Sequence, residues 1–236
     1  MNLQRLDKII SSQLNISRSI SRTEIRRGKV KVNGETVRDP SLLFNAEENE
    51  ITYMQTTLNY KKFVYILMNK PKGVLSAATD KTRETVVDLV PKELRRPTLF
   101  PVGRLDKDTT GLLIITDDGD FAHRVISPKK NVSKTYKVVL DGELCTHLPD
   151  LFESGIVLAD GIKCKEAKLE IIDKNIAKVT VTEGRYHQIK RMFGTVGLGV
   201  NDLERIALGE LLLPPDLEYG ECVELSQKEL EKILKG

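Results

Sequence analysis

Short apolar runs of strand length, separated by polar turns, constrain the fold of this chain more than any other feature. Such runs occupy residues 63–68, 112–116 and 135–140, and two further runs, 167–172 and 176–182, alternate on either side of Asp173-Lys174-Asn175. Runs of this length predict strands, and two alternating runs joined by a short polar turn predict a hairpin. Because hairpins outnumber strand–helix–strand units, we predict an α+β fold: a largely antiparallel mixed sheet flanked by helices at 120–126, 185–196 and 227–234.

The chain of 236 residues is long enough for one large domain or two unequal ones. No apolar run approaches the roughly 18 residues of a membrane span, and the N-terminus lacks the apolar centre of a signal peptide. We therefore expect a cytoplasmic protein without a membrane partner. Three widely spaced cysteines, Cys145, Cys164 and Cys222, form no C-x-x-C pair and are interpreted as packing residues rather than metal ligands.

Positive charge is concentrated near the N-terminus. Residues 1–40 hold nine Lys or Arg against four Asp or Glu, a net +5, whereas residues 41–60 hold three Glu and no basic side chain. The +3 of the whole chain hides this segregation. A basic segment is the electrostatic footprint expected for binding a nucleic-acid backbone, although on charge alone a solvated helix face is the better interpretation.

The pattern within the basic segment predicts two small helices and a hairpin. Apolar residues at positions 3, 6, 9, 10 and 14 have helical spacing. Ser21-Arg22-Thr23-Glu24 fits a capping box and predicts that a second helix begins there, displays Arg22 and Arg26, and stops at Gly28. Residues 30–37 alternate about Asn33-Gly34, which is a strong hairpin signal.

This unit resembles the S4 RNA-binding domain, on the stretch from Ser17-Arg18-Ser19 through the basic residues 26–31 to Asn33-Gly34. We therefore expect an S4 domain at 1–56, a polar linker at 57–62 and a larger domain at 63–236. The resemblance implies that RNA is contacted by the basic side chains Arg18, Arg22, Arg26, Arg27, Lys29 and Lys31.

One polar loop of the larger domain is the best candidate for chemistry. The sequence GRLDKDTTG at 103–111 leads directly into the apolar run 112–116, and a carboxylate on a loop anchored by a core strand is held rigidly enough to act as nucleophile or base. Three other interpretations compete. Asp106-x-Asp108-x-Thr110-Gly111 begins like a calcium loop, but Ile114 and Asp117 occupy later ligand positions. The two aspartates also fit a glycosidase pair, or a surface turn with capping aspartates.

A family resemblance changes that ranking. The string 103–113, followed by Thr116-Asp117-Asp118-Gly119, is similar to the central motif of the RsuA branch of pseudouridine synthases. Three more segments resemble motifs of this branch in the expected order: NKPKG at 69–73, KTY at 134–136 and EGRYHQIKRMF at 183–193. An N-terminal S4 domain is also usual in this branch.

The resemblance implies isomerisation of a uridine in ribosomal RNA, without redox change or group transfer, so that no cofactor and no metal are needed. It implies that Asp106 is the catalytic carboxylate, attacking the ribose or removing a sugar proton, and that Tyr136 stacks on the base. By register Lys190 is the expected cation beside Asp106, with Arg185 and Arg191 as substitutes. Because a stacked uridine must flip to reach Asp106, Arg104 is expected to fill the vacated space or clamp a phosphate.

The segment YHQIKRMF at 186–193 is closer to the small-subunit 16S rRNA enzyme, which modifies a uridine of the position-516 type, than to relatives acting on 23S rRNA. We therefore expect a monomer that binds 16S rRNA or the assembling small subunit, with His187 contacting RNA or making local hydrogen bonds. Two alternatives stay open: an enzyme of the same family acting on 23S rRNA, and a non-catalytic S4-type assembly factor.

Overall fold

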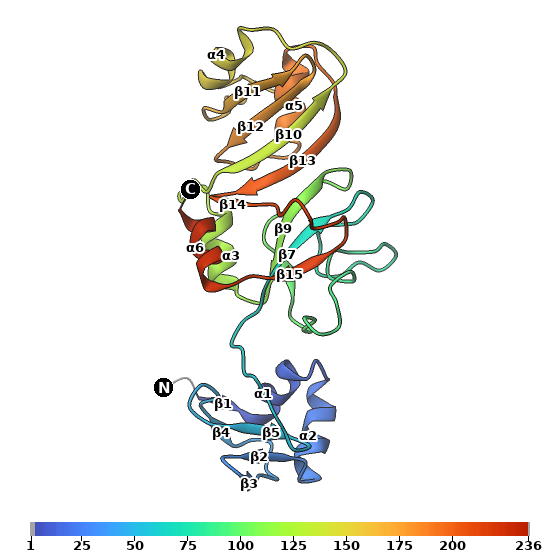
Figure 1. Cartoon of the computed structure of the whole chain (residues 1–236), viewed down its shortest axis with the longest axis vertical. Coiled ribbons are helices and arrows are strands. Elements are labelled where there is room, and N and C mark those ends of the chain that lie inside the picture. Colours follow the sequence, from blue (N-terminus) through green and yellow to red (C-terminus); the bar gives the residue numbers. More distant parts are fainter. Residues whose placement is uncertain (1–2, 236) are drawn as a thin grey trace. The chain divides into compact units, whose positions relative to one another are not determined.

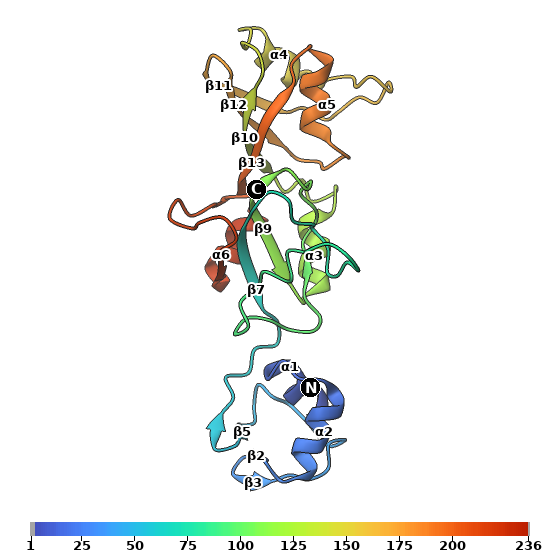
Figure 2. The ribbon, with the colours of Figure 1, turned by 90° about the vertical axis from the view of Figure 1, so that its right-hand side faces the viewer.

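The computed structural model describes residues 3–235, so residues 1, 2 and 236 of the expected domains lie outside it. The chain forms two compact units, Met1–Phe63 with Arg95–Thr98, and Val64–Leu94 with Leu99–Gly236. Figures 1 and 2 show both units from two sides. The expected boundaries at residues 56, 57–62 and 63 stay predictions.

The first unit packs two helices against short strands. Its elements are β1 (Gln4–Arg5), α1 (Leu6–Gln13), α2 (Arg18–Arg26), β2 (Val30–Val32), β3 (Glu35–Thr36), β4 (Leu43–Phe44), β5 (Ile51–Tyr53) and β6 (Thr56–Thr57). Strands β3-β2-β5-β6 form an antiparallel sheet, and β1 pairs with β4. Leu6, Ile9 and Ile10 of α1 pack with Ile25 of α2 and Val30 of β2 in a small core, because both helices turn their apolar stripes inward.

The Asn33-Gly34 hairpin prediction is confirmed. Val32 of β2 faces Glu35 of β3, and both turn residues have positive φ, 51° and 82°, as the tight turn requires. The predicted start of the second helix is wrong. Helix α2 begins at Arg18 with Ser17 as its N-cap, whose side chain accepts from the Ile20 N–H, and Ser21 lies inside the helix. The Ser21 hydroxyl instead donates to the backbone carbonyl of Asp7, so it joins α2 to α1.

The second unit is built on one sheet of nine strands, as the predicted α+β fold requires. Seven strands follow the order β11-β12-β10-β13-β9-β7-β15, with β14 paired to β13 and β8 to β9. The strands are β7 (Tyr65–Lys70), β8 (Phe100–Pro101), β9 (Thr110–Thr116), β10 (Lys134–Leu140), β11 (Lys168–Asp173), β12 (Ile176–Val181), β13 (Val200–Leu208), β14 (Leu211–Leu212) and β15 (Cys222–Glu224). Every pair is antiparallel except β13 with β9.

The parallel pair β9–β13 joins the two antiparallel halves of the sheet. It is short, with Glu204 opposite Thr110 and Arg205 opposite Gly111. Gly111 has a φ of +98°, and a Cβ there would collide with the backbone of Arg205. Only glycine therefore allows β13 to approach β9 this closely.

Four helices complete the second unit: α3 (Gly119–Ile126), α4 (Leu148–Glu153), α5 (Gln188–Thr195) and α6 (Gln227–Leu234). Helices α3 and α6 lie side by side against β9 and β7, around Phe121 and Ile233 (Figure 1). Helices α4 and α5 cover β10, β11 and β12, with Phe152 and Phe193 in ring contact at 5.0 Å. Each helix presents one apolar face to the sheet, which positions the loops between strands.

The structure also departs from the sequence predictions within the second unit. Strand β13, at the centre of the sheet, and helix α4 were not predicted. Helix α5 begins at Gln188 rather than at 185. Cys164 is buried and Cys222 half-buried, but Cys145 is exposed and is not a packing residue. Among residues 3–235, every helix is too short or too polar to span a bilayer.

Candidate active site

A cleft of about 440 Å³ in the second unit brings most of the predicted residues of this unit together. It lies where the loop before β9, the start of β10 and the segment before α5 meet. Its lining includes the predicted residues Arg104, Asp106, Tyr136, Arg185 and His187. Clefts of about 300–1,000 Å³ are the usual size for binding a small molecule or a single nucleotide.

The loop that carries Asp106 is fixed from both sides. Leu105, directly before it, is buried, and its backbone N–H and carbonyl both bond the Ser76 hydroxyl, at 3.1 and 2.8 Å. After it, the Thr109 N–H donates to the Asp106 carbonyl at 3.1 Å, which closes a tight turn. The Gly73 N–H donates to the Lys107 carbonyl at 2.8 Å. The carboxylate therefore stands on a rigid backbone.

Lys70 at the end of β7 supports the same turn from within. Its side chain has no exposed surface, and its Nζ donates to the carbonyls of Lys107 and Thr109 at 3.3 and 3.0 Å and to that of Pro71 at 2.9 Å. Burial lowers the pKa of Lys70 to about 8, against the opposing attraction of the Asp108 and Asp106 carboxylates. Three backbone oxygens are thus held at one point by a single buried ammonium group.

The charges around Asp106 differ from the expected pairing. Lys190 donates to Asp108, at 2.5 Å, and this bond lowers the pKa of the Asp108 carboxyl. The group next to Asp106 is instead His187, with its Nε2 3.5 Å from Oδ1 of Asp106, an ion pair when the imidazole is protonated. Asp106 is about 30% exposed, so it is open to the cleft. The catalytic role of Lys190 stays a prediction.

Glu183 holds the segment before α5 in a non-helical shape. Its buried carboxylate accepts from Arg185 Nε at 3.0 Å, from Gln188 Nε2 at 2.9 Å and from the Lys165 N–H at 3.0 Å. Gln188 in turn accepts from the Arg185 N–H. His187 is left with a φ of +49°, which is uncommon for a residue with a Cβ. This network explains why α5 starts late and why His187 reaches Asp106.

Two aromatic side chains border the cleft in different ways. Tyr136 on β10 is half-buried and packs against two of the hydrophobic cores, so its ring is fixed. Tyr186 is 74% exposed and stacks on His187, with ring centroids 3.9 Å apart and planes 17° apart. The predicted Arg191 does not line the cleft; it donates to Asp160 instead.

The lining also includes residues that were not among the predicted site residues, such as Lys134, Thr109 and Arg205. Lys134 and Tyr136 are two positions apart on β10, so their side chains share one face of the sheet. That spacing was a usable signal for Lys134. Arg205 gave no such signal, because its strand was not predicted.

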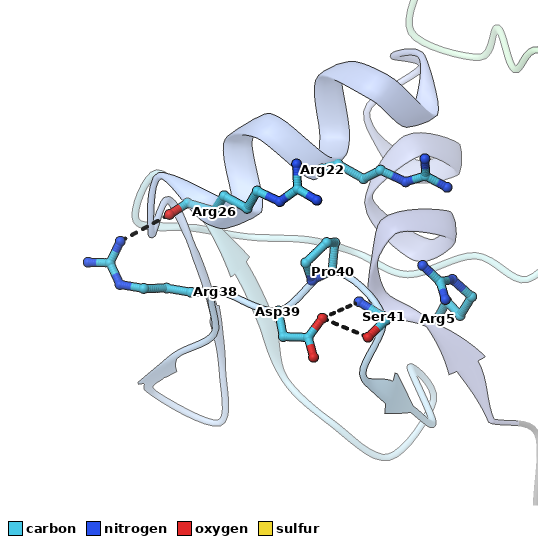
Figure 3. A pocket seen from close by; sticks show the side chains of 7 residues that line it. All are labelled: Arg5, Arg22, Arg26, Arg38, Asp39, Pro40 and Ser41. Atoms are coloured by element: carbon cyan, nitrogen blue, oxygen red, sulfur yellow. Dashed lines mark hydrogen bonds between the residues drawn. The ribbon is translucent and has the colours of Figure 1, made fainter.

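The basic residues of the first unit divide into two groups. Arg22 and Arg26 of α2 line a pocket of about 630 Å³ together with Arg5 and Arg38 (Figure 3). Arg5 and Arg38 were not among the predicted RNA contacts. Arg38 donates to the carbonyl of Arg26 at 3.1 Å, which ties the loop after β3 to the end of α2. The sequence shows no reason for this convergence, since residues 5, 26 and 38 come from three separate segments.

A buried carboxylate orders three of these arginines. Asp7 has no exposed surface and accepts from Arg5 at 3.0 Å, from Arg18 at 2.9 Å and from Arg22 at 2.8 Å. Although burial opposes ionisation, the three guanidinium groups lower the pKa of Asp7 well below its ordinary value. Each arginine is still 43–49% exposed and keeps part of its charge on the surface.

The second basic group surrounds Glu24. Lys29 donates to this carboxylate at 2.5 Å, Tyr53 at 2.8 Å and Arg27 at 3.4 Å. These bonds lower the pKa of Glu24, led by the one from Lys29. Lys31 on β2 is exposed between two buried valines. Across residues 3–235, no group of three or more His, Cys, Asp or Glu side chains is arranged to hold a metal ion.

Comparisons with known proteins agree with this geometry. Residues 64–195 match the RNA pseudouridylate synthase family and residues 4–49 match the S4 domain. A protein of Bacillus subtilis described as an uncharacterized RNA pseudouridine synthase is 40% identical, covering 97% of this chain and 98% of its own. Ribosomal small subunit pseudouridine synthase A of Escherichia coli is 37% identical, covering 98% of this chain and 100% of its own. A solved pseudouridylate synthase structure superposes with a TM-score of 0.69 at 38% identity, covering 97% of this chain and 99% of that one.

Proposed function

The chain belongs to the RNA pseudouridylate synthase family and contains an S4 domain, and from this premise we propose that it converts a uridine of small-subunit 16S rRNA, of the position-516 type, to pseudouridine. Family membership confirms the resemblance predicted from the motifs. The choice of RNA is supported by relatives of Escherichia coli and Haemophilus influenzae that are named as small-subunit enzymes and match over nearly the whole chain. The protein acts on this RNA, free or in the assembling subunit, as a cytoplasmic monomer.

The reaction exchanges one bond of the nucleoside for another. The N1–C1′ bond breaks, the base turns, and C5 bonds to C1′, while C5 loses a proton and N1 gains one. Atoms and electrons balance without any redox partner. The protein has to supply a carboxylate at the ribose, a surface for the detached base and an enclosed site in which the base can turn.

One observation supports this function above all: the turn that carries Asp106, held by the bonds of Leu105 to Ser76, lines the same cleft as the half-buried ring of Tyr136. In the proposal Asp106 acts at the ribose and Tyr136 stacks on the base. His187 lies beside Asp106, and Lys190 acts through Asp108 at the same turn.

Binding of the RNA requires the target nucleotide to leave its stack, at a cost of a few kcal/mol. Arg104 and Arg185 on the rim of the cleft are placed to hold the flanking phosphates, and Arg191 adds charge at α5. In the first unit, Arg18, Arg22 and Arg26 supply one basic surface, and Arg27, Lys29 and Lys31 supply the other. These contacts provide sequence-independent affinity for the phosphate backbone.

Replacement of Asp106 by Asn tests the catalytic assignment. The amide keeps the size of the side chain but cannot act as a carboxylate, so release of tritium from C5-labelled uridine in 16S rRNA should fall below detection while RNA affinity is retained. Asp150→Asn, an exposed change on α4, is the matched control and should keep wild-type turnover. Normal turnover by Asp106→Asn would contradict the assignment.

The choice of RNA is tested separately by mapping pseudouridines after incubation with 16S or 23S transcripts. We expect modification of a single uridine in 16S rRNA only. Modification of 23S rRNA alone would show that the substrate is the RNA of the large subunit. Binding without modification of either RNA, under conditions that retain the fold, would indicate an assembly factor.

A further inference from the structure

The floor of the cleft contains polar groups that the rest of the protein leaves without partners. Within the described part of the chain, Nη2 of Arg205 and Oγ1 of Thr109 are buried and make no hydrogen bond. Both residues line the cleft that holds Asp106, and they are only 3% and 2% exposed. A buried donor without a partner destabilises the folded protein, so its retention calls for an explanation.

Arg205 is held in a fixed orientation beside Tyr136. The two residues are direct partners in the β13–β10 register, so their side chains lie on the same face of the sheet. Nε of Arg205 donates to the Leu112 carbonyl on β9 at 2.7 Å, which anchors the guanidinium group at the junction of the two strands. Gly111 permits this approach. The unpaired Nη2 is therefore positioned by the fold rather than free to search for a partner.

Lys134 adds a second cation to the same floor. Its Nζ donates to the Val132 carbonyl at 2.8 Å. Burial, and then the charges of Arg205 and Lys165, lower the pKa of Lys134 to about 8, and no carboxylate offsets them. The half-buried Lys134 and the buried Arg205 thus line one cleft, and the charge of Arg205 acts on Lys134. Such a site favours a ligand that brings carbonyl oxygens or negative charge.

We infer that Arg205, together with Thr109, donates hydrogen bonds to a ring carbonyl of the flipped uracil, and that Lys134 stabilises the negative charge which the base takes up as its N1–C1′ bond breaks. This inference rests on the proposed function, whose substrate it specifies at the level of single atoms. Uracil has carbonyl acceptors at C2 and C4, whereas cytosine carries an amino donor at C4 that would oppose a guanidinium group. Cytosine shares the C2 carbonyl, so the same residues select uridine over cytidine where their acceptor is the C4 carbonyl.

An enzyme–substrate double-mutant cycle tests this hydrogen bond. Replacement of one ring carbonyl by a thiocarbonyl, in 16S rRNA with 2-thiouridine or 4-thiouridine at the target position, weakens that acceptor alone. Single-turnover rates of wild type and Arg205→Met are measured on all three RNAs by chromatography of the nucleosides. We expect Arg205→Met to lower the rate about 100-fold on uridine, with RNA affinity nearly unchanged. One of the two thio substitutions should lower the single-turnover rate of the wild type about 10-fold. The same substitution should not lower the rate of Arg205→Met below its rate on unmodified uridine.

The controls separate a substrate contact from a structural role. Arg83→Met removes an exposed arginine and should keep both the rate and the thio effect. If Arg205→Met fails to fold, Thr109→Val replaces it in the cycle, since it removes one hydroxyl and keeps the shape. If the rate effects of Arg205→Met and of each thio substitution are fully additive in an active enzyme, the inference is overturned while the proposed function stands. That result is expected if Arg205 binds a phosphate instead of the base. A wild-type protein that isomerises no uridine would overturn both.

Discussion

A lysine without exposed surface, Lys70, fixes the backbone on which Asp106 stands. Its ammonium group gathers carbonyls from both sides of the turn, so the turn cannot move without breaking several hydrogen bonds. Burial lowers the pKa of Lys70 and outweighs the nearby Asp108 and Asp106 carboxylates, which raise it. The residue acts on catalysis through position rather than by touching substrate.

Replacement of Lys70 by Met should therefore reduce turnover more than binding. Loss of the three bonds frees the turn, and a displacement of about 1 Å at a catalytic group lowers the rate about 100-fold. We expect kcat for tritium release to fall about 10- to 100-fold and RNA affinity to change less than about twofold. Lys72→Met, a change to an exposed lysine of the same loop paired with Asp202, is the control. Equal losses by both variants would show that the position of the turn does not depend on Lys70.

The motifs that carry the family resemblance predicted the members of the site better than their partners. The GRLD segment and the EGRYHQ segment placed Asp106, Arg185 and His187 in one cleft. They did not reveal that Lys190 bonds Asp108, because that choice depends on the late start of α5, which in turn depends on the buried Glu183. An interaction that depends on several tertiary contacts at once cannot be predicted from the spacing of residues along the chain.

At the scale of elements, the two helices of the first unit are joined through a charged residue as well as through their apolar stripes. Asp7 in the first turn of α1 receives two arginines from α2, and Ser21 adds a third link between these helices. Carboxylates paired in this way stabilise the folded state only while they are ionised. The basic surface and the helix packing therefore depend on the same group.

Asp7→Asn should weaken the α1–α2 pair by about 2 kcal/mol at pH 7, since hydrogen bonds to a charged partner are removed. The folded-state pKa of Asp7 lies below its ordinary value of 3.8, so its contribution is complete above that value and is lost as the pH falls below it. Hydrogen exchange of α1 and α2 amides in the full chain gives both the loss and its pH dependence. The control Asp39→Asn, at an exposed turn, should change neither the protection of these amides nor its pH dependence. Wild-type protection in Asp7→Asn would refute this role.

Strand β13 shows why a central element can escape prediction. Its inward residues Leu203, Arg205 and Ala207 alternate properly, but an arginine in the core breaks the apolar pattern. The strands with uniform apolar faces, such as β9 and β12, were predicted within two residues of their ends. Strand β13 was not predicted because it carries Arg205, whose charged side chain is buried where the pattern requires an apolar one.

For the whole molecule, the net charge of +3 describes neither unit. The first forty residues carry a net +5, whereas the cleft combines the exposed Arg104 and Arg185 with the buried Arg205 in its lining. Arg18 and Arg22 cannot be neutralised without removing hydrogen bonds to Asp7. The salt dependence of RNA binding is therefore best tested at exposed basic residues that do not bond Asp7.

Arg26→Gln combined with Lys31→Gln should weaken RNA binding and flatten its dependence on salt. For every phosphate that the protein no longer neutralises, the slope of log K against log salt becomes shallower by about 0.7–0.9. The matched control, Lys228→Gln with Lys232→Gln on α6, removes the same charge from an exposed helix and should leave the slope unchanged. Equal slopes in wild type and both variants would exclude the first unit as the backbone-binding surface.

The central place of β13 also has a consequence for synthesis of the protein. Asp106 precedes β9 and Tyr136 lies on β10, and these two strands meet only through β13, which ends at Leu208. The bond from Arg205 to Leu112 spans 93 positions of the chain. A nascent chain that has not yet exposed β13 outside the ribosome has two unfinished sheet edges and no assembled cleft. The enzyme thus gains its site only after β13 has left the ribosome, and truncations before residue 200 are expected to be inactive.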